Sequence, residues 1–83
     1  MASKLLSVIV RSREGIKWEG EAESVTSVNE VGPFDVLPLH TNFVALINNR
    51  LTIHKPGGQN EEINLKKGVM TVTSNKVTVL IGV

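Results

Sequence analysis

A chain of 83 residues suffices for one domain, and no linker, low-complexity tract or internal repeat divides it, so we expect residues 1–83 to form one domain. Hydrophobic residues make up 41% and charged residues 20%, which favours a globular protein over a disordered or fibrous one. The net charge of +1 gives no reason to expect nucleic acid or another polyanion, and the absence of cysteine excludes disulfides and thiolate metal sites.

The first apolar run, residues 5–10, is expected to form a strand that extends to Arg11. It is far shorter than the ~20 residues that a membrane span requires. Arg11 and Arg13 follow it where a secretory signal would have a small-residue cleavage site, so we expect neither a membrane helix nor a signal peptide.

The next segment alternates strictly between apolar and charged residues. The expected inward positions are Ile16, Trp18, Gly20 and Ala22, and the expected outward positions are Lys17, Glu19, Glu21 and Glu23. This period of two predicts a strand with one buried and one solvated face, with Trp18 packed in the core. The next apolar residues are Val25 and Val28, so the phase changes at Ser24, which predicts a bulge, a bend or a new strand there.

The segment GPFDVLPLHTNF, residues 32–43, contains two prolines on either side of a short strand around FDVL. Its apolar side chains and the fixed backbone angles of Pro33 and Pro38 suit a surface of defined shape that another protein contacts. The overlapping stretch NFVALINN, residues 42–49, permits one or two helical turns, but a strand is the preferred interpretation.

The second half of the chain predicts two hairpins. Alternating segments around residues 51–54 and 62–65 are separated by Pro56, Gly57 and Gly58, which indicates a glycine-rich loop. Lys66 and Lys67 are interpreted as solvated turn residues before the run VMTVT, and Ser74-Asn75 then forms a tight turn into KVTVLIGV. Together the segments predict an all-β fold, a flattened β-sandwich or barrel of about eight to ten short strands.

Signatures of chemistry are weak throughout. Asp35 and His40 could act as acid and base, but no serine occupies a strained G-x-S-x-G turn. His40 and His54 lack the spacing of paired metal ligands, and Gly57-Gly58 lacks the lysine of a phosphate-binding loop. We therefore expect no catalytic residue, no metal and no cofactor. From the residues alone, the prediction is a small all-β binding or structural module.

Several motifs in order make the chain similar to a known family. EGxxxEGEAxSV from Glu14 to Val25, GPFDVLPLHTNF, LTIHK and a closing hairpin at NKVTVL resemble the N-terminal β-sandwich domain of the epsilon subunit of F-type ATP synthases. The most specific match comprises Gly32, Phe34, Asp35, Val36, Leu37, Pro38 and His40. Leu39 stands where glycine is common, and Thr41 and Asn42 replace the usual small and proline residues.

The resemblance implies a non-catalytic subunit of the central stalk, or rotor. Its partners would be the gamma subunit and the c-ring, and it would help couple proton translocation to ATP synthesis. The implied c-ring contact comprises Asn29, Glu30, Val31, Gly32 and Pro33. The implied gamma contact comprises His40, Thr41, Asn42 and Phe43.

The same resemblance implies a peripheral location on the cytoplasmic face of the energy-coupling membrane, with membrane association through the complex and no direct insertion. Family members usually continue into a helical hairpin, whereas this sequence ends at Val83, so inhibition and nucleotide binding are not carried over. A free-standing β-sandwich adaptor or ligand-binding module with an epsilon-like fold is the alternative hypothesis.

Overall fold

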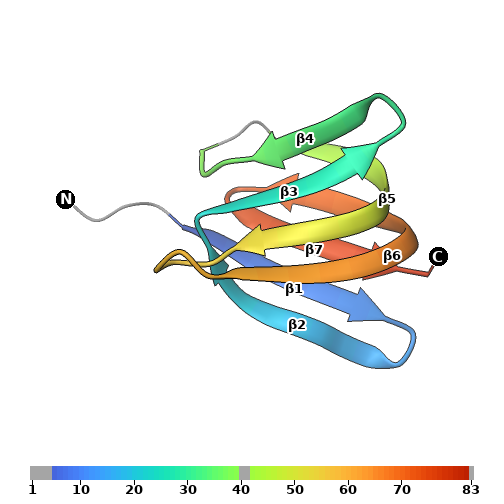
Figure 1. Cartoon of the computed structure of the whole chain (residues 1–83), viewed down its shortest axis with the longest axis horizontal. Coiled ribbons are helices and arrows are strands. Elements are labelled where there is room, and N and C mark those ends of the chain that lie inside the picture. Colours follow the sequence, from blue (N-terminus) through green and yellow to red (C-terminus); the bar gives the residue numbers. More distant parts are fainter. Residues whose placement is uncertain (1–4, 40–41, 83) are drawn as a thin grey trace.

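The computed structural model describes residues 5–39 and 42–82, and every regular element within those ranges is a strand (Figure 1). The seven strands are β1 (Leu6–Ser12), β2 (Gly15–Ala22), β3 (Ser24–Asn29), β4 (Gly32–Val36), β5 (Phe43–His54), β6 (Asn60–Thr73) and β7 (Lys76–Ile81). The all-β prediction is confirmed, and so is the strand interpretation of the stretch after Asn42. The described strands are fewer than the eight to ten predicted because β5 and β6 are each long enough to replace two short strands.

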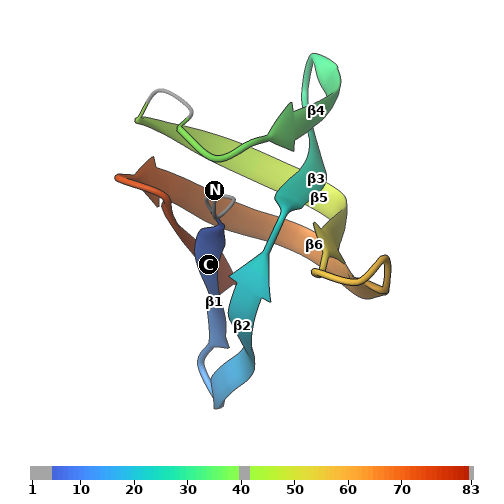
Figure 2. The ribbon, with the colours of Figure 1, turned by 90° about the vertical axis from the view of Figure 1, so that its left-hand side faces the viewer.

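The strands form one sheet in the order β2-β1-β7-β6-β5-β3-β4, with β1 and β7 parallel and all other neighbours antiparallel. The pairing of β5 with β6 shifts register between Asn48 and Asn49, and the sheet folds over on itself (Figure 2). We call one side the β3–β4 layer, which also contains residues 49–54 and 60–65. The other is the β1–β7 layer, which contains β1, β2, β7 and residues 43–48 and 67–73.

Lys66 and Lys67 lie inside β6, at the bend between the two layers, so the prediction that they form a turn is wrong. The predicted turns on either side of them are confirmed. Gly57 and Gly58 adopt φ angles of 91° and 87° in the β5–β6 loop. Ser74 and Asn75 adopt φ angles of 49° and 64°, the left-handed pair that a tight two-residue hairpin requires.

The core lies between the two layers and is built from alternate residues of each strand. Its fully or nearly fully buried hydrophobic side chains are Leu6, Val8, Val10, Ala22, Val25, Val36, Ile47, Leu51, Ile53, Leu65, Met70, Val72, Val77 and Val79. Trp18 is half-buried and packs against this cluster, as expected. A Cβ atom added at Gly20 would lie 2.9 Å from the Trp18 ring, so the glycine leaves space for the indole on this edge strand.

Ile16 is 55% exposed, so its predicted burial is wrong. The pairing of β1 with β2 shifts register between Val10 and Arg11: Trp18 stands opposite the buried Val10, but Ile16 stands opposite the exposed Arg11. The bulge therefore turns Ile16 to the outer face. The predicted break at Ser24 is confirmed, since β2 ends at Ala22, β3 begins at Ser24, and the Glu23 N–H donates to the His54 carbonyl at 2.7 Å.

Candidate docking surface

The implied c-ring contact, residues 29–33, forms the tight turn between β3 and β4. The side-chain oxygen Oδ1 of Asn29 accepts hydrogen bonds from the N–H groups of Val31 at 2.8 Å and Gly32 at 3.1 Å. Gly32 adopts a φ of 140°, a conformation that L residues rarely occupy. Val31 is 91% exposed at the tip. The turn is thus held from within by Asn29 while its tip is presented to solvent.

A groove of about 540 Å³ lies beside this turn. It is bordered by the turn on one side and by the bend of β5 and β6 on the other, so Glu30, Val31, Leu46, Lys66 and Lys67 all line it. The groove therefore brings together a carboxylate, two ammonium groups and apolar side chains that lie far apart in the sequence.

The implied gamma contact begins at His40 and Thr41, which lie outside the described residues. The residues around them are tied to the β6–β7 turn: the Leu39 N–H donates to Asn75 Oδ1 at 2.7 Å, and the Ser74 N–H donates to Asn42 Oδ1 at 3.0 Å. Phe43 is half-buried, packs against the core, and meets Phe34 edge to face with ring centroids 6.2 Å apart. This anchoring fixes where the following residues of β5 emerge.

The outer face of the β1–β7 layer carries three exposed large apolar side chains. Val44 is 68% exposed, Leu46 74% and Leu80 41%. The register places Leu46 opposite Val69 and Val69 opposite Leu80, so these three side chains form one row across β5, β6 and β7. An exposed row of large apolar side chains is typical of a protein–protein contact.

Sequence reasoning did not identify this face. The signal was present, because residues 43–47 and 77–81 contain apolar residues in both phases of the alternation rather than in one. A strand with that pattern is typically covered on both faces.

The outer face of the β3–β4 layer is polar and carries a hydrogen-bond chain. Thr26 Oγ1 donates to Asp35 Oδ1 at 2.6 Å, so it has no further proton and accepts from His54 Nε2 at 2.9 Å. His54 Nδ1 lies 3.2 Å from Asn60 Oδ1. A catalytic triad needs the histidine between the hydroxyl and the acid, and here the hydroxyl stands between them. These hydrogen bonds therefore tie together the four strands β3, β4, β5 and β6, and they do not form the arrangement that activates a nucleophile.

Among the described residues, no group of three or more histidine, cysteine or acidic side chains could hold a metal ion. Within the same ranges no helix is long and apolar enough to cross a bilayer. The candidate binding surfaces among the described residues are the β3–β4 turn with its groove and the apolar outer face of the β1–β7 layer.

Comparison with known proteins agrees with the fold and the motifs. Residues 5–82 match the family described as ATP synthase, Delta/Epsilon chain, beta-sandwich domain. The chain belongs to this family. The ATP synthase epsilon chain of a Nitratiruptor species is 32% identical over 77 residues, which are 92% of this chain and 60% of that relative. The ATP synthase epsilon chain of Corynebacterium aurimucosum is 35% identical over 71 residues, which are 83% of this chain and 58% of the relative.

Solved structures share the fold of this family member. A chain of the Euglena gracilis mitochondrial ATP synthase, in a structure of OSCP, F1 and c-ring, superposes with a TM-score of 0.86 at 15% identity, over 93% of this chain and 50% of that one. A chain of the Tetrahymena thermophila mitochondrial ATP synthase, in a structure of the central stalk and c-ring, superposes with a TM-score of 0.77 at 9% identity, over 98% and 66%. These chains therefore share the fold of the domain described here. The present chain spans about 60% of the length of the first curated relative it matches.

Proposed function

We propose that this chain is a non-catalytic rotor subunit of an F-type ATP synthase that connects the gamma subunit to the c-ring. The carrying observation is membership of the ATP synthase Delta/Epsilon chain beta-sandwich domain family over residues 5–82. A subunit in this position must bind two partners at once, and the described residues offer two candidate surfaces, the apolar outer face and the β3–β4 turn, which adjoin at the groove.

The gamma subunit is assigned to the apolar outer face of the β1–β7 layer, together with Asn42 and Phe43 at its border and with His40 and Thr41, which precede them in the chain. Val44 and Leu46 follow Phe43 directly along β5 and are largely exposed. Large apolar side chains at the centre of an interface contribute most of its affinity, whereas polar residues at the rim mainly set specificity. In this arrangement Phe43 supports the contact from within, and Val44 and Leu46 meet the partner.

The c-ring is assigned to Asn29, Glu30, Val31, Gly32 and Pro33. The two hydrogen bonds to Asn29 Oδ1 give the turn one conformation before binding, which lowers the entropy lost on docking. Glu30 would fix register by pairing with a basic or polar loop, and an exposed ion pair of this kind contributes only ~0–1 kcal/mol. Val31 would supply the apolar contact.

Binding to the cognate gamma subunit tests the first assignment. The change is Leu46→Glu, which puts a charge at the most exposed position of the apolar row without disturbing the core. The matched control is Asn64→Glu, an equal change in charge at an exposed position of the β3–β4 layer. We expect Leu46→Glu to weaken binding by more than about tenfold, the loss typical of an interface hot spot, and the control to leave it within about twofold. Absence of binding by the unmodified protein at micromolar concentration, with gamma alone and with gamma plus c-ring, would contradict the proposed function.

Crosslinking tests the second assignment. In the assembled rotor, Glu30→Cys should form a disulfide with a cysteine placed in a c-ring loop, because the turn presents this position to the ring. Glu62→Cys is the control, since Glu62 is exposed in the same layer but near its opposite end, close to the β5–β6 loop. Equal yields from the two positions would exclude the assignment.

A further inference from the structure

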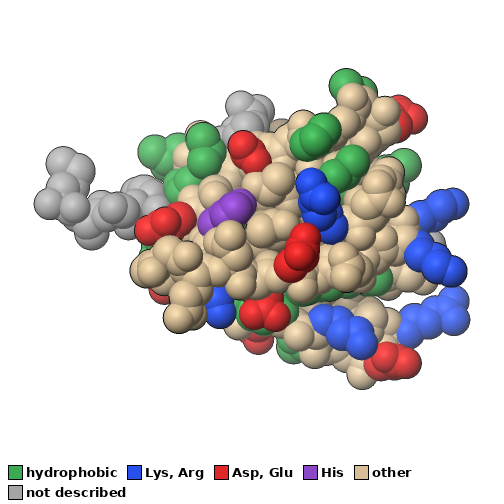
Figure 3. All heavy atoms as spheres, in the orientation of Figure 1, with side chains coloured by type: hydrophobic (Ala, Val, Ile, Leu, Met, Phe, Trp, Pro, Cys, Tyr) green, Lys and Arg blue, Asp and Glu red, His purple; other side chains and the backbone are tan. Residues whose placement is uncertain are grey.

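The near-neutral net charge conceals a marked separation of charge along the molecule. Six of the nine lysine and arginine residues gather at the end that carries the β1–β2 and β3–β4 turns: Arg11, Arg13, Lys17, Arg50, Lys66 and Lys67. Only two of the eight acidic residues, Glu14 and Glu30, lie in those turns. Figure 3 shows the lysine and arginine side chains concentrated toward the right of the view, where Figure 1 places both turns. We call this region the basic end.

Strand pairing explains why residues so far apart in sequence share this end. Two overlapping rows of paired residues together lead from the β1–β2 hairpin to the β3–β4 hairpin. The first row crosses β1, β7, β6 and β5 through Arg11, Leu80, Val69 and Leu46. The second crosses β6, β5 and β3 through Lys67, Asn48 and Val28. Arg50 stands opposite Asn64, within the segment of β5 that bulges relative to β3. The bend of β5 and β6 thus lies at the same end as the two turns, and its basic residues join those of the β1–β2 hairpin.

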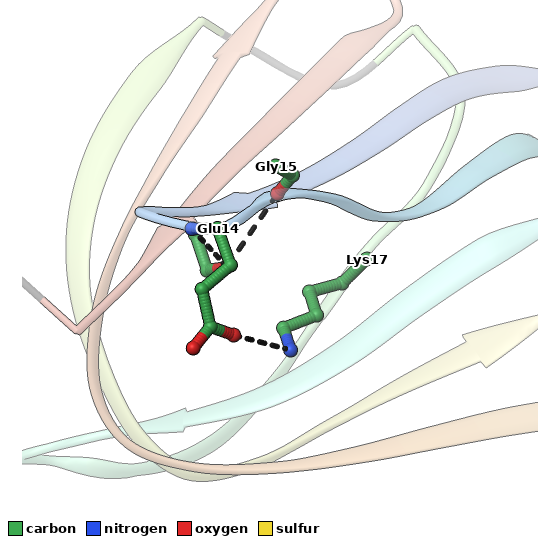
Figure 4. Close-up of polar contacts among 4 residues, drawn as sticks. Glu14, Gly15 and Lys17 are labelled. Carbon is green, nitrogen blue, oxygen red and sulfur yellow. Dashed lines mark hydrogen bonds and ion pairs between the residues drawn. The ribbon is translucent and has the colours of Figure 1, made fainter.

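Most of these charges are available to a partner. Lys17 Nζ lies 3.4 Å from Glu14 Oε1, an exposed pair within the β1–β2 hairpin (Figure 4). No ion pair involves the other five basic residues within the described part of the chain, and all five are exposed. The two acids do not cancel the excess, so the basic end keeps a positive potential that extends over about one Debye length, ~8–10 Å in physiological salt.

Exposed apolar side chains stand among these charges. Ile16 is 55% exposed beside Lys17, and Val31 is 91% exposed across the groove from Lys66 and Lys67. A partner that satisfied only the charges would leave Ile16 in water, and also any part of Val31 that the c-ring does not cover. The interfacial region of a lipid bilayer accommodates both kinds of group, with anionic headgroups for the lysines and the upper acyl chains for the apolar tips.

We propose that the basic end binds anionic phospholipid headgroups at the membrane surface. The proposal rests on the proposed function, because the c-ring turn lies at this end and would face the bilayer. It adds a direct lipid contact to a membrane association otherwise mediated by protein partners. Headgroup binding would orient the domain on the ring while the apolar outer face remains free for gamma.

Vesicle binding tests the proposal without any other subunit. The full chain is mixed at low ionic strength with phosphatidylcholine vesicles and with vesicles that also contain phosphatidylglycerol, and bound protein is measured after sedimentation. We expect binding to the anionic vesicles only, and its loss as salt is raised. Each basic residue near an anionic surface strengthens binding about fivefold, so Lys66→Gln with Lys67→Gln should lower the partition coefficient roughly 25-fold. Ile16→Asp should lower it as well, because it removes an exposed apolar side chain outside the c-ring contact and adds a repulsive charge.

The matched control is Lys55→Gln with Lys76→Gln, which removes the same charge from the other end of the strands. We expect about a twofold effect at most from this pair, since both positions lie more than a Debye length from a membrane at the basic end. Equal losses from the two double variants would overturn the proposal, as would absence of binding to anionic vesicles. Binding to a c-ring with acidic loops but not to vesicles would overturn it in favour of a protein partner. The same variants are also measured for binding to gamma. Failure of the proposed function would appear as loss of gamma binding, and failure of the lipid proposal would appear in the vesicle assay.

Discussion

Replacing Leu39 by glycine should stabilise the protein, although it deletes a large hydrophobic side chain. Leu39 has a φ of 66°, in the left-handed region that costs an L residue about 1–2 kcal/mol. Its side chain is 75% exposed, so little apolar burial is lost. Glycine removes the strain but loses about 0.5–1 kcal/mol through the entropy of its unfolded backbone. The net expectation is a gain of about 0.5–1 kcal/mol.

Thermal unfolding measures this gain, with an expected rise in Tm of about 2–8 °C for a domain of this size. Leu39→Ala is the first control, because it removes the side chain but keeps the Cβ that causes the strain, and it should give no gain. Leu37→Gly is the second, because Leu37 is also exposed, at 54%, but is not among the residues with positive φ, and here glycine should destabilise. If Leu39→Gly and Leu37→Gly lower Tm equally, the strain argument is wrong.

Two further changes probe the bends of the long strands. Ser27 is fully buried, and its Oγ donates a hydrogen bond to the Arg50 carbonyl at 2.8 Å beside the bulge in β5. Ser27→Ala should therefore lower the free energy of unfolding, measured in urea, by about 1–3 kcal/mol. A loss below about 0.5 kcal/mol would mean that water replaces the hydrogen bond. A Cβ atom added at Gly68 would lie 2.9 Å from the Leu80 carbonyl oxygen. Gly68→Ala should therefore destabilise the protein by about 1–3 kcal/mol and shift the amide NMR signals of β7. Unchanged stability would show that the backbone has room to move.

The sequence predicted the elements wherever one face of a strand is buried and the other solvated. Alternation from Trp18 to Ala22 and the left-handed Ser74-Asn75 turn are local features, and both occur as expected. The errors have a common cause. Ile16 and the Lys66-Lys67 pair both lie at register shifts, where their own strand carries one residue more than its partner, Lys17 in β2 and Lys66 in β6. The alternation of a single strand does not show where such an extra residue is inserted, because the insertion is defined only by the pairing with the neighbouring strand.

The candidate surfaces were predictable to different degrees. The β3–β4 turn was identified from residues contiguous in the chain, and its assignment to the c-ring stays a prediction. The row of Leu46, Val69 and Leu80 and the gathering of basic residues at one end depend on which strands pair, and in what register. Net charge in particular cannot reveal such a separation, because it sums over positions that only the sheet topology sorts.

The parallel pairing of β1 with β7 has a mechanical consequence. Five residue pairs, from Ser7 with Lys76 to Arg11 with Leu80, join these two strands, which run in the same direction. A force that pulls the start of β1 and the end of β7 apart acts along the strands and loads these hydrogen bonds together, whereas the same force across a hairpin would open its bonds one after another. In the proposed rotor role this joint would resist torque, because it yields abruptly at a high force rather than stretching gradually under a small one.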